Sequence, residues 1–320
     1  MSKIPFPRVL EALQDPSAAF PRRYLKNFSD LEPGDLQALL AVWGNVPTPR
    51  KQQLVRDLEL LSADDTLVSM DAFARAMLDD PDEQVRVYAV RMLWENGDPR
   101  LATRLIRLLQ EDPNEEVRAE AASVLGGFVY RGELEEISPE LLKEVEDALL
   151  AAAGQDEHRL SKRMAVEALG YSSRPEVTAL IRNAYSQHDP QWVGSALFAM
   201  GRSADAELWQ AEVLFSLDHD QPEIRLAAVQ AAGELALESA RPALLAALET
   251  EENEDIYRAI IWSLSQIGGP DVQVVLYNLA DAAQDDELGE FIEEALENLT
   301  FTEDLERYDL FSYDPDEEEE

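Results

Sequence analysis

A motif of about 32 residues recurs along most of this 320-residue chain and restricts its fold more than any other feature. In the clearest copies an Asp-Pro pair precedes an aliphatic-Arg pair, which is followed by Ala and Leu at fixed offsets. We take as an anchor the residue before this Arg, or the equivalent residue in copies that lack the Arg. The anchors are Val85, Val117, Ser161, Trp192, Ile224, Ile256 and Leu288, and their spacings are 32, 44, 31, 32, 32 and 32. A fixed period of this length indicates a repeat architecture, with one supersecondary unit per period.

Each anchor starts an apolar pattern that predicts the first helix of a unit. Four residues after the anchors stand Ala89, Ala121, Ala165, Ala196, Ala228, Ile260 and Ile292. Eight residues after them stand Leu93, Leu125, Leu169, Met200, Ala232, Leu264 and Leu296. Positions i, i+4 and i+8 lie on one helix face, so we expect this face to form the core. The small Ala in the middle favours close approach of neighbouring helices.

Proline marks the expected helix starts. Second helices should begin at Asp98-Pro99, Arg174-Pro175 or Gly269-Pro270, because proline suits the first helical position. First helices should be capped by the side chains of Asp80, Asp112 and Asp189, each followed by proline. Glu83 and Glu115 are predicted to complete capping boxes. No segment alternates as a strand would, so we predict an all-α fold of stacked helix pairs.

The segments DPNEEVRAEAASVLG and QPEIRLAAVQAAGEL carry a more specific resemblance. They resemble HEAT repeats, particularly the short variety of bilin-lyase-like (PBS-lyase) HEAT proteins, over residues 79–302, and a weaker eighth copy precedes them at 50–78. The resemblance implies a right-handed α-solenoid of HEAT/armadillo-like helix pairs with seven to eight repeats. It also implies a polar ladder between repeats, formed by Asp80, Asp112, Asp156, Arg86, Arg118, Lys162 and Arg225.

The pattern divides the chain into three parts. Residues 1–48 are rich in proline and are expected to form an irregular helical N-terminal cap, residues 49–302 the solenoid, and residues 303–320 an acidic, disordered tail. The 44-residue spacing places an insertion at residues 127–139. We expect this insertion to be a loop, which either binds a partner or is neutral growth of the chain.

Charge and cysteine content exclude several functions. The chain carries 27 Lys and Arg against 65 Asp and Glu, a formal charge of −38, and no Cys. A surface this negative repels phosphate, so nucleic acids and anionic membranes are not expected partners. Without cysteine there is no disulfide, thiolate nucleophile or Cys-ligated metal. The start of the chain has no apolar signal region, and we expect a cytoplasmic protein, with a monomer favoured.

The sequence offers no catalytic motif. His158, His188 and His219 fall in three successive repeats, but packed helices are about 8–10 Å apart, so we predict neither a metal site nor a cofactor. No His is followed by Glu, as the di-iron HEAT proteins would require. The tryptophans Trp94, Trp192, Trp209 and Trp262 have the spacing of core residues.

These observations favour a non-catalytic scaffold that binds another protein on the extended solenoid surface, and a basic protein is one candidate partner. The alternatives are an acidic nucleic-acid mimic or chaperone of a basic protein, and a tetrapyrrole-handling protein like the bilin lyases. The candidate partner-binding residues are a basic stripe on one helix and the acidic end of the chain, namely Arg100, Arg104, Arg107, Glu317, Glu318, Glu319 and Glu320.

Overall fold

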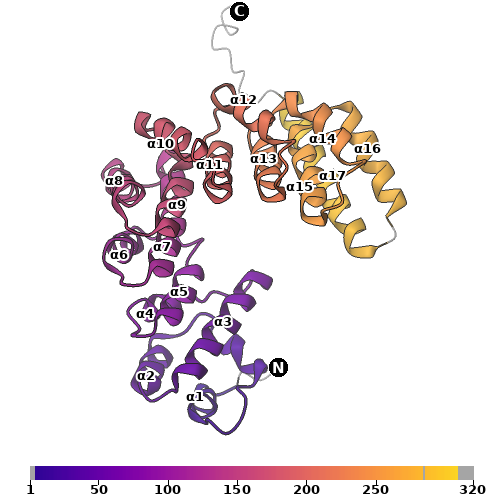
Figure 1. Cartoon of the computed structure of the whole chain (residues 1–320). Coiled ribbons are helices and arrows are strands. Elements are labelled where there is room, and N and C mark those ends of the chain that lie inside the picture. The colour runs from indigo at the N-terminus through magenta and orange to yellow at the C-terminus, as the bar shows by residue number, and fades with distance from the viewer. Residues whose placement is uncertain (1–3, 284, 309–320) are drawn as a thin grey trace, which may run out of the picture. The chain divides into compact units, whose positions relative to one another are not determined.

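The computed structural model describes residues 4–283 and 285–308 (Figure 1). Within these residues every regular element is a helix, which confirms the all-α prediction. The chain divides into two compact units, Met1–Leu169 and Gly170–Glu320. None of the described helices combines the length and the apolar character needed to cross a membrane.

The first unit contains an N-terminal group of short helices followed by helix pairs. Its elements are α1 (Phe6–Gln14), η1 (Arg22–Phe28), α2 (Pro33–Trp43), α3 (Thr48–Asp64), α4 (Asp71–Met77), α5 (Glu83–Arg91), α6 (Pro99–Glu111), α7 (Glu115–Glu133), α8 (Pro139–Gln155) and α9 (Arg159–Ala168). The first helices α5, α7 and α9 pack against one another in one layer, and the second helices α6 and α8 form another (Figure 1).

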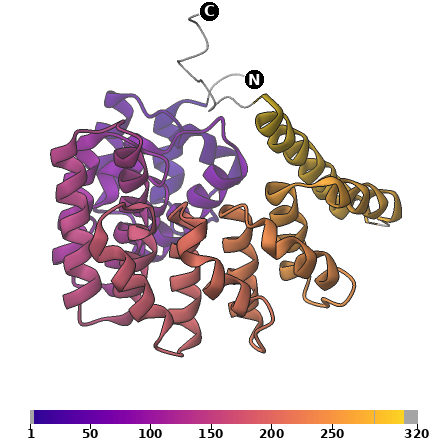
Figure 2. The same cartoon turned by 90° about the horizontal axis from the view of Figure 1, so that it is seen from above.

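The second unit repeats this arrangement. After the 3-10 turn η2 (Leu169–Tyr171), its elements are α10 (Pro175–Tyr185), α11 (Pro190–Arg202), α12 (Ala206–Ser216), α13 (Pro222–Glu234), η3 (Glu238–Ala240), α14 (Arg241–Ala247), α15 (Glu254–Ile267), α16 (Pro270–Ala282) and α17 (Asp286–Tyr308). The first helices α11, α13, α15 and α17 pack in succession, and the helix pairs follow one another along the unit (Figures 1 and 2).

The predicted core face is confirmed in six of the seven repeats. Every residue four positions after an anchor is buried, from Ala89 to Ile292. The last repeat departs from the pattern, since Leu288 and Leu296 are half-buried, whereas Ile292, Ala295 and Leu299 are buried. This helix, α17, is the last of the described helices and packs mainly against α15 and α16, so its core face is narrower.

The predicted caps at Asp80 and Asp112 are wrong by two residues. Helix α5 begins at Glu83 and is capped by Asp82, whose side chain accepts from the Val85 amide. Helix α7 is capped in the same way by Asn114. Because Glu83 and Glu115 are then the first residues of their helices, they cannot form the predicted capping boxes.

Other predicted helix starts are confirmed. Asp189 caps α11 by accepting from the amides of Gln191 and Trp192. Asp98 caps α6 through the Arg100 amide. The starts of α10 and α16 at Pro175 and Pro270 also agree with the sequence.

The insertion at 127–139 is helical rather than a loop over most of its length. Helix α7 spans 19 residues, compared with nine in α5, and continues to Glu133. Residues Phe128, Val129 and Gly132 of the extension are buried. A short connection then leads to α8, where Ser138 accepts from the Leu141 amide. The added residues therefore lengthen the helix pair and enlarge its core.

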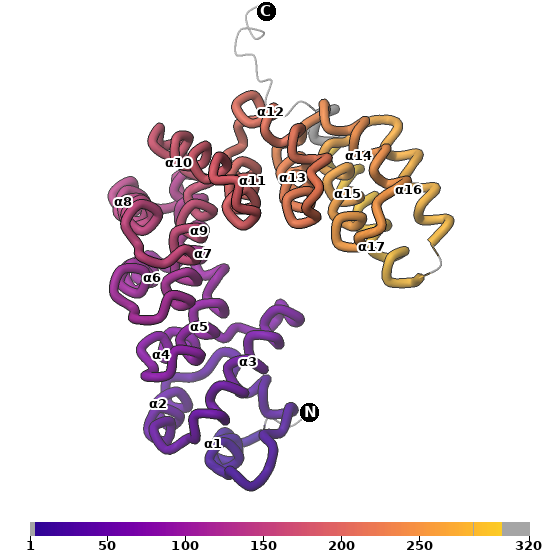
Figure 3. Tube along the Cα trace, in the orientation of Figure 1, coloured from indigo at the N-terminus to yellow at the C-terminus, as the bar shows by residue number. Residues whose placement is uncertain are grey.

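The two ends of the chain differ from the repeats in the middle. In the N-terminal cap the short elements α1, η1 and α2 precede the first helix pair, α3 and α4, which is the weaker eighth repeat (Figure 3). At the other end, α17 continues six residues into the predicted tail, as far as Tyr308. The remaining tail residues, including Glu317 to Glu320, lie outside the described residues.

Candidate interaction surfaces

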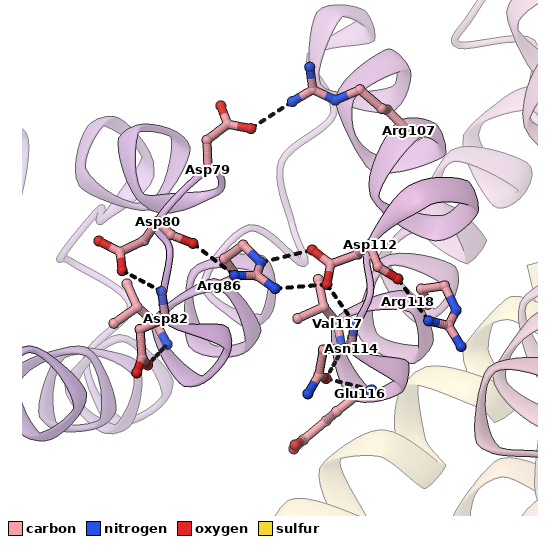
Figure 4. A network of polar contacts seen from close by, with 11 residues as sticks. Asp79, Asp80, Asp82, Arg86, Arg107, Asp112, Asn114, Glu116, Val117 and Arg118 are labelled. Carbon is pink, nitrogen blue, oxygen red and sulfur yellow. Dashed lines mark hydrogen bonds and ion pairs between the residues drawn. The ribbon is translucent and has the colours of Figure 1, made fainter. Parts of the chain in front are cut away.

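A buried ion pair joins the repeat formed by α5 and α6 to the next repeat, formed by α7 and α8. Arg86 on α5 donates from Nε and Nη2 to the two carboxylate oxygens of Asp112, both at 2.8 Å. Its third nitrogen, Nη1, donates to the main-chain oxygen of Asp80 at 2.8 Å (Figure 4). The Arg86 guanidinium thus fixes the loop of its own repeat against the loop of the next.

The same geometry recurs one repeat later. Arg118 on α7 donates to the Asp156 carboxylate at 2.9 and 3.3 Å. Its Nη1 also donates to the Asp112 main-chain oxygen at 2.7 Å, a contact drawn in Figure 4. Each acid is also held by its own loop, since Asp112 accepts from the Asn114 amide and Asp156 from the His158 amide. These contacts confirm the ladder that the family resemblance implies.

The ladder extends beyond these two pairs. In the N-terminal part, Asp80 accepts from Trp43 Nε1 at 2.6 Å and from Lys51 Nζ at 3.3 Å. In the second unit, Arg225 binds Glu251 at 3.2 Å and donates to the His219 main-chain oxygen at 2.9 Å. The sequence prediction missed Glu251, although it lies five residues before its anchor, as Asp80 and Asp112 do. Lys162 departs from the prediction, because its Nζ donates to the Gly154 carbonyl at 3.4 Å.

The ladder perturbs the acidity of its carboxyl groups. Burial would raise the pKa of Asp156, but hydrogen bonds from Arg118 and the His158 amide lower it overall. The pKa of Glu251 is lowered chiefly by the Asn253 amide and further by Arg225. Hydrogen bonding to the charged form stabilises that form, so these groups contribute to stability in their ionised state.

The predicted basic stripe lies on α6 and is ion-paired. Arg104 and Arg107 both contact Asp79, in the connection between α4 and α5, at 2.7 and 2.6 Å (Figure 4 draws the Arg107 pair). Arg100 pairs with Asp98 at 3.2 Å, and its side chain is 90% exposed. The structure therefore places the three arginines on one helix surface, each beside an aspartate, and their role in partner binding stays a prediction.

The three histidines occupy separate loops. His158 Nδ1 lies 3.2 Å from Glu115, and His219 Nδ1 accepts from the Gln221 amide. His188 has a positive φ of 55° in the turn before α11. Among the described residues no group of three or more His, Asp and Glu is placed to hold a metal ion.

A pocket of about 560 Å³ opens on the first-helix layer of the second unit. Four helices line it. Phe198 comes from α11, Leu226, Gln230 and Glu234 from α13, Asp255, Arg258, Ala259, Trp262, Ser263 and Gln266 from α15, and Phe291 from α17. The small Ala259 leaves room between the larger side chains.

Aromatic rings form much of the pocket wall. The rings of Trp262 and Phe291 lie 6.3 Å apart, and Trp262 is 38% exposed. The Arg202 guanidinium covers Phe198 at 4.0 Å from the ring centroid. The prediction of core tryptophans is confirmed for Trp192 and Trp209 but wrong for Trp262 and for Trp94, which is 66% exposed. Helical spacing alone did not reveal that these two rings lie off the buried face.

The pocket acid Glu234 has a perturbed pKa. Burial raises its pKa above the usual value, although the nearby charge of Arg202 lowers it. The residue is nonetheless partly accessible to solvent, and its carboxylate lies against Gly201, whose missing Cβ leaves room for it. In the described part of the chain no hydrogen bond or ion pair joins the Glu234 carboxylate to another side chain.

The repeat pattern and the ladder define a HEAT repeat protein, and sequence comparison agrees. The HEAT repeat family matches residues 70–145 and 211–300, just over half of the chain. The chain therefore belongs to the HEAT repeat family.

Two relatives illustrate the extent of the likeness. A HEAT repeat-containing taxis protein of Halobacterium salinarum is 29% identical over 185 residues, which cover 58% of this chain and 38% of that protein. The match thus spans well under half of the relative's length. Among solved structures, the complex of CpcE and CpcF of phycocyanin lyase from Nostoc is 15% identical with a TM-score of 0.52, covering 89% of this chain and 97% of that one. At this identity the likeness concerns the fold alone.

Proposed function

We propose that this chain is a non-catalytic scaffold that binds another protein through the surface of its HEAT repeats. The observation that supports the proposal is the pocket on α11, α13, α15 and α17. Exposed tryptophan in a concave, partly apolar site is typical of the residues that dominate protein–protein binding energy. Trp262 and Phe291 supply such an anchor point.

The geometry of the repeats supports a binding role over a catalytic one. The conspicuous polar groups, Arg86, Arg118 and Arg225, are engaged with the loops of neighbouring repeats. They hold the stack in register and leave the outer surface of the first-helix layer to contact other molecules.

A role in taxis is a second proposal. It is supported by the 29% identity over 185 residues with the Halobacterium taxis protein. Deleting the gene and measuring swarm-plate expansion tests it, with the wild-type gene supplied in trans as the control. An unchanged swarm diameter would contradict a role in taxis without affecting the scaffold proposal.

Site-specific crosslinking tests the scaffold proposal. The photoreactive residue p-benzoylphenylalanine is placed at position 262 in the pocket, and in a control at position 215 on α12, where Phe215 is 78% exposed. We expect one defined crosslinked protein from position 262 and none from 215. Filling the pocket by Ala259→Leu in the same chain should abolish that product.

The outcomes separate the alternatives. Equal crosslinking from positions 262 and 215, or none from either, would contradict binding through this pocket. A family of basic proteins crosslinked from both positions favours the mimic or chaperone. A coloured tetrapyrrole that copurifies with the chain would favour the third alternative, a tetrapyrrole-handling protein like the bilin lyases.

A further inference from the structure

We propose that the pocket of the second unit receives a cationic side chain, an arginine or lysine, presented by a segment of the partner protein. This inference rests on the proposed scaffold function and specifies the chemistry of its partner. It is carried by the pocket walls, by an acidic group that forms no ion pair or hydrogen bond with another side chain among the described residues, and by the charge of the surrounding unit.

The pocket walls already attract guanidinium groups. Arg202 stacks on Phe198 at 4.0 Å from the ring centroid, and Arg258 on Phe291 at 5.4 Å. The face of an aromatic ring attracts a cation within about 6 Å, most strongly when the ring is Trp. Trp262 is the pocket aromatic over which no cation is placed among the described residues, and its ring remains accessible.

The charges that face the ring are predominantly acidic. Arg258 is already ion-paired with Glu254 and Glu287, at 3.2 and 3.5 Å. Glu234 and Asp255 line the pocket, and neither forms an ion pair with another described residue. The charge of Arg202 only partly offsets the burial of Glu234, so an incoming cation would stabilise this carboxylate further by favouring its charged form.

Two side-chain amides complete the recognition surface. Gln230 and Gln266 line the pocket, and the described residues provide neither amide with a hydrogen-bond partner. Each amide can both donate and accept, so the pair suits the main chain of a peptide or the N–H groups of a guanidinium. An extended segment can therefore bind by its backbone while its charged side chain enters the pocket.

The surrounding unit steers cations toward this site. Residues 170–320 contain 7 Lys and Arg against 34 Asp and Glu, a net charge of −27. Such a field raises the local concentration of a positive ligand and its rate of association. Long-range attraction brings the partner near, while the aromatic wall and Glu234 select the side chain.

Fluorine NMR of the full chain labelled with 5-fluorotryptophan tests the proposal. The five tryptophans give five resonances, and that of Trp262 is assigned with Trp262→Phe. The probes are three heptapeptides that carry arginine, its neutral isostere citrulline, or glutamate between two leucines. The exposed Trp94 in the first unit is an internal control, and 0.5 M salt suppresses nonspecific attraction.

We expect the arginine peptide to shift the Trp262 resonance and leave Trp94 unchanged. Binding of the citrulline peptide should be about tenfold weaker, since a charge-assisted contact and a cation–π contact are lost. Glu234→Gln should remove most of the preference for arginine. The matched variant Glu249→Gln, which neutralises an exposed acid in the turn after α14 and outside the pocket, should preserve it.

Several results would overturn the inference. Equal shifts by the arginine and citrulline peptides would mean that charge is not recognised, and a larger shift by the glutamate peptide would mean that the pocket selects anions. Absence of any Trp262 shift would also refute it. In each case the crosslinking experiment at position 262 still tests the scaffold proposal separately. The variant Ala259→Leu, which fills the pocket at a half-buried position, should abolish binding with the tryptophan spectrum otherwise unchanged.

Discussion

The Arg86 guanidinium holds the Asp112 carboxylate of the next repeat through two hydrogen bonds, both 2.8 Å long. Both side chains are almost fully buried, at 10% and 4% exposure. Because the pair spans two repeats, it couples the stability of one helix pair to that of its neighbour.

Replacing Arg86 by Ala should therefore be strongly destabilising. The change leaves the Asp112 charge buried without its main partner, and the expected loss is about 3–5 kcal/mol in the free energy of unfolding. Chemical denaturation monitored by circular dichroism measures it. Arg100→Ala, at a 90% exposed position, is the control and should cost at most about 1 kcal/mol. Similar losses in both variants would contradict a special role for the buried pair.

Because of the Arg118–Asp156 pair, we expect the free energy of unfolding to depend on pH. The pKa of Asp156 is lowered in the folded protein, so its stabilising contribution is present above the unfolded pKa and is lost as the pH falls through the folded pKa. Asp156→Asn should cost about 1.5–3 kcal/mol at pH 7. The difference between wild type and variant should stay constant down to about pH 5 and shrink below about pH 4. A difference that persists at pH 3 would refute this assignment.

The close packing of α13 against α15 at Gly233 can be tested by adding a methyl group there. A Cβ atom at this position would lie 2.8 Å from the Ser263 Cα, so Gly233→Ala must displace backbone and should destabilise by about 1–3 kcal/mol. Gly194 on α11 is the matched control, because a Cβ there meets nothing within 4 Å. Gly194→Ala should instead stabilise by about 0.5–1 kcal/mol. Thermal unfolding distinguishes the two, and equal effects would show that the helices have room to adjust.

Much of the fold could be predicted because it depends on a local pattern. Anchors such as Val85 and Val117 and the alanines four residues later are buried as their spacing requires. Pro at position 99, 139 or 190 starts a helix because its geometry restricts the main chain locally.

Features that depend on neighbouring segments could not be predicted in the same way. The sequence predicts Asp80 as a helix cap, but its carboxylate accepts hydrogen bonds from Trp43 at the end of α2 and from Lys51 on α3. The extension of α7 to Glu133 depends on buried contacts that the spacing does not reveal. Likewise, Phe198, Trp262 and Phe291 meet in one pocket only because α11, α15 and α17 belong to one packed layer.

The arginine stripe provides a separate test of where the partner binds. Arg104 and Arg107 share the Asp79 carboxylate, and the pocket belongs to the other unit. We expect the variant with Arg100, Arg104 and Arg107 all replaced by Glu to bind the partner crosslinked at position 262 with unchanged affinity. Isothermal titration with that partner measures the affinity. A loss of tenfold or more would assign the stripe to the binding surface.

The net charge of −38 predicts that salt stabilises the whole chain. Like charges repel in the compact state, and raising ionic strength from 0.05 to 1 M shortens the screening length to about 3 Å. Buried contacts such as Arg86–Asp112 are screened much less, so the loss of repulsion should dominate and Tm should rise by several degrees. Differential scanning calorimetry across this range measures the slope. Neutralising the four exposed acids of α17, Glu290, Glu293, Glu294 and Glu297, should reduce that slope, because they contribute to the repulsion. A Tm that falls as salt is added would mean that attractive ion pairs between the repeats outweigh the repulsion among the excess acids.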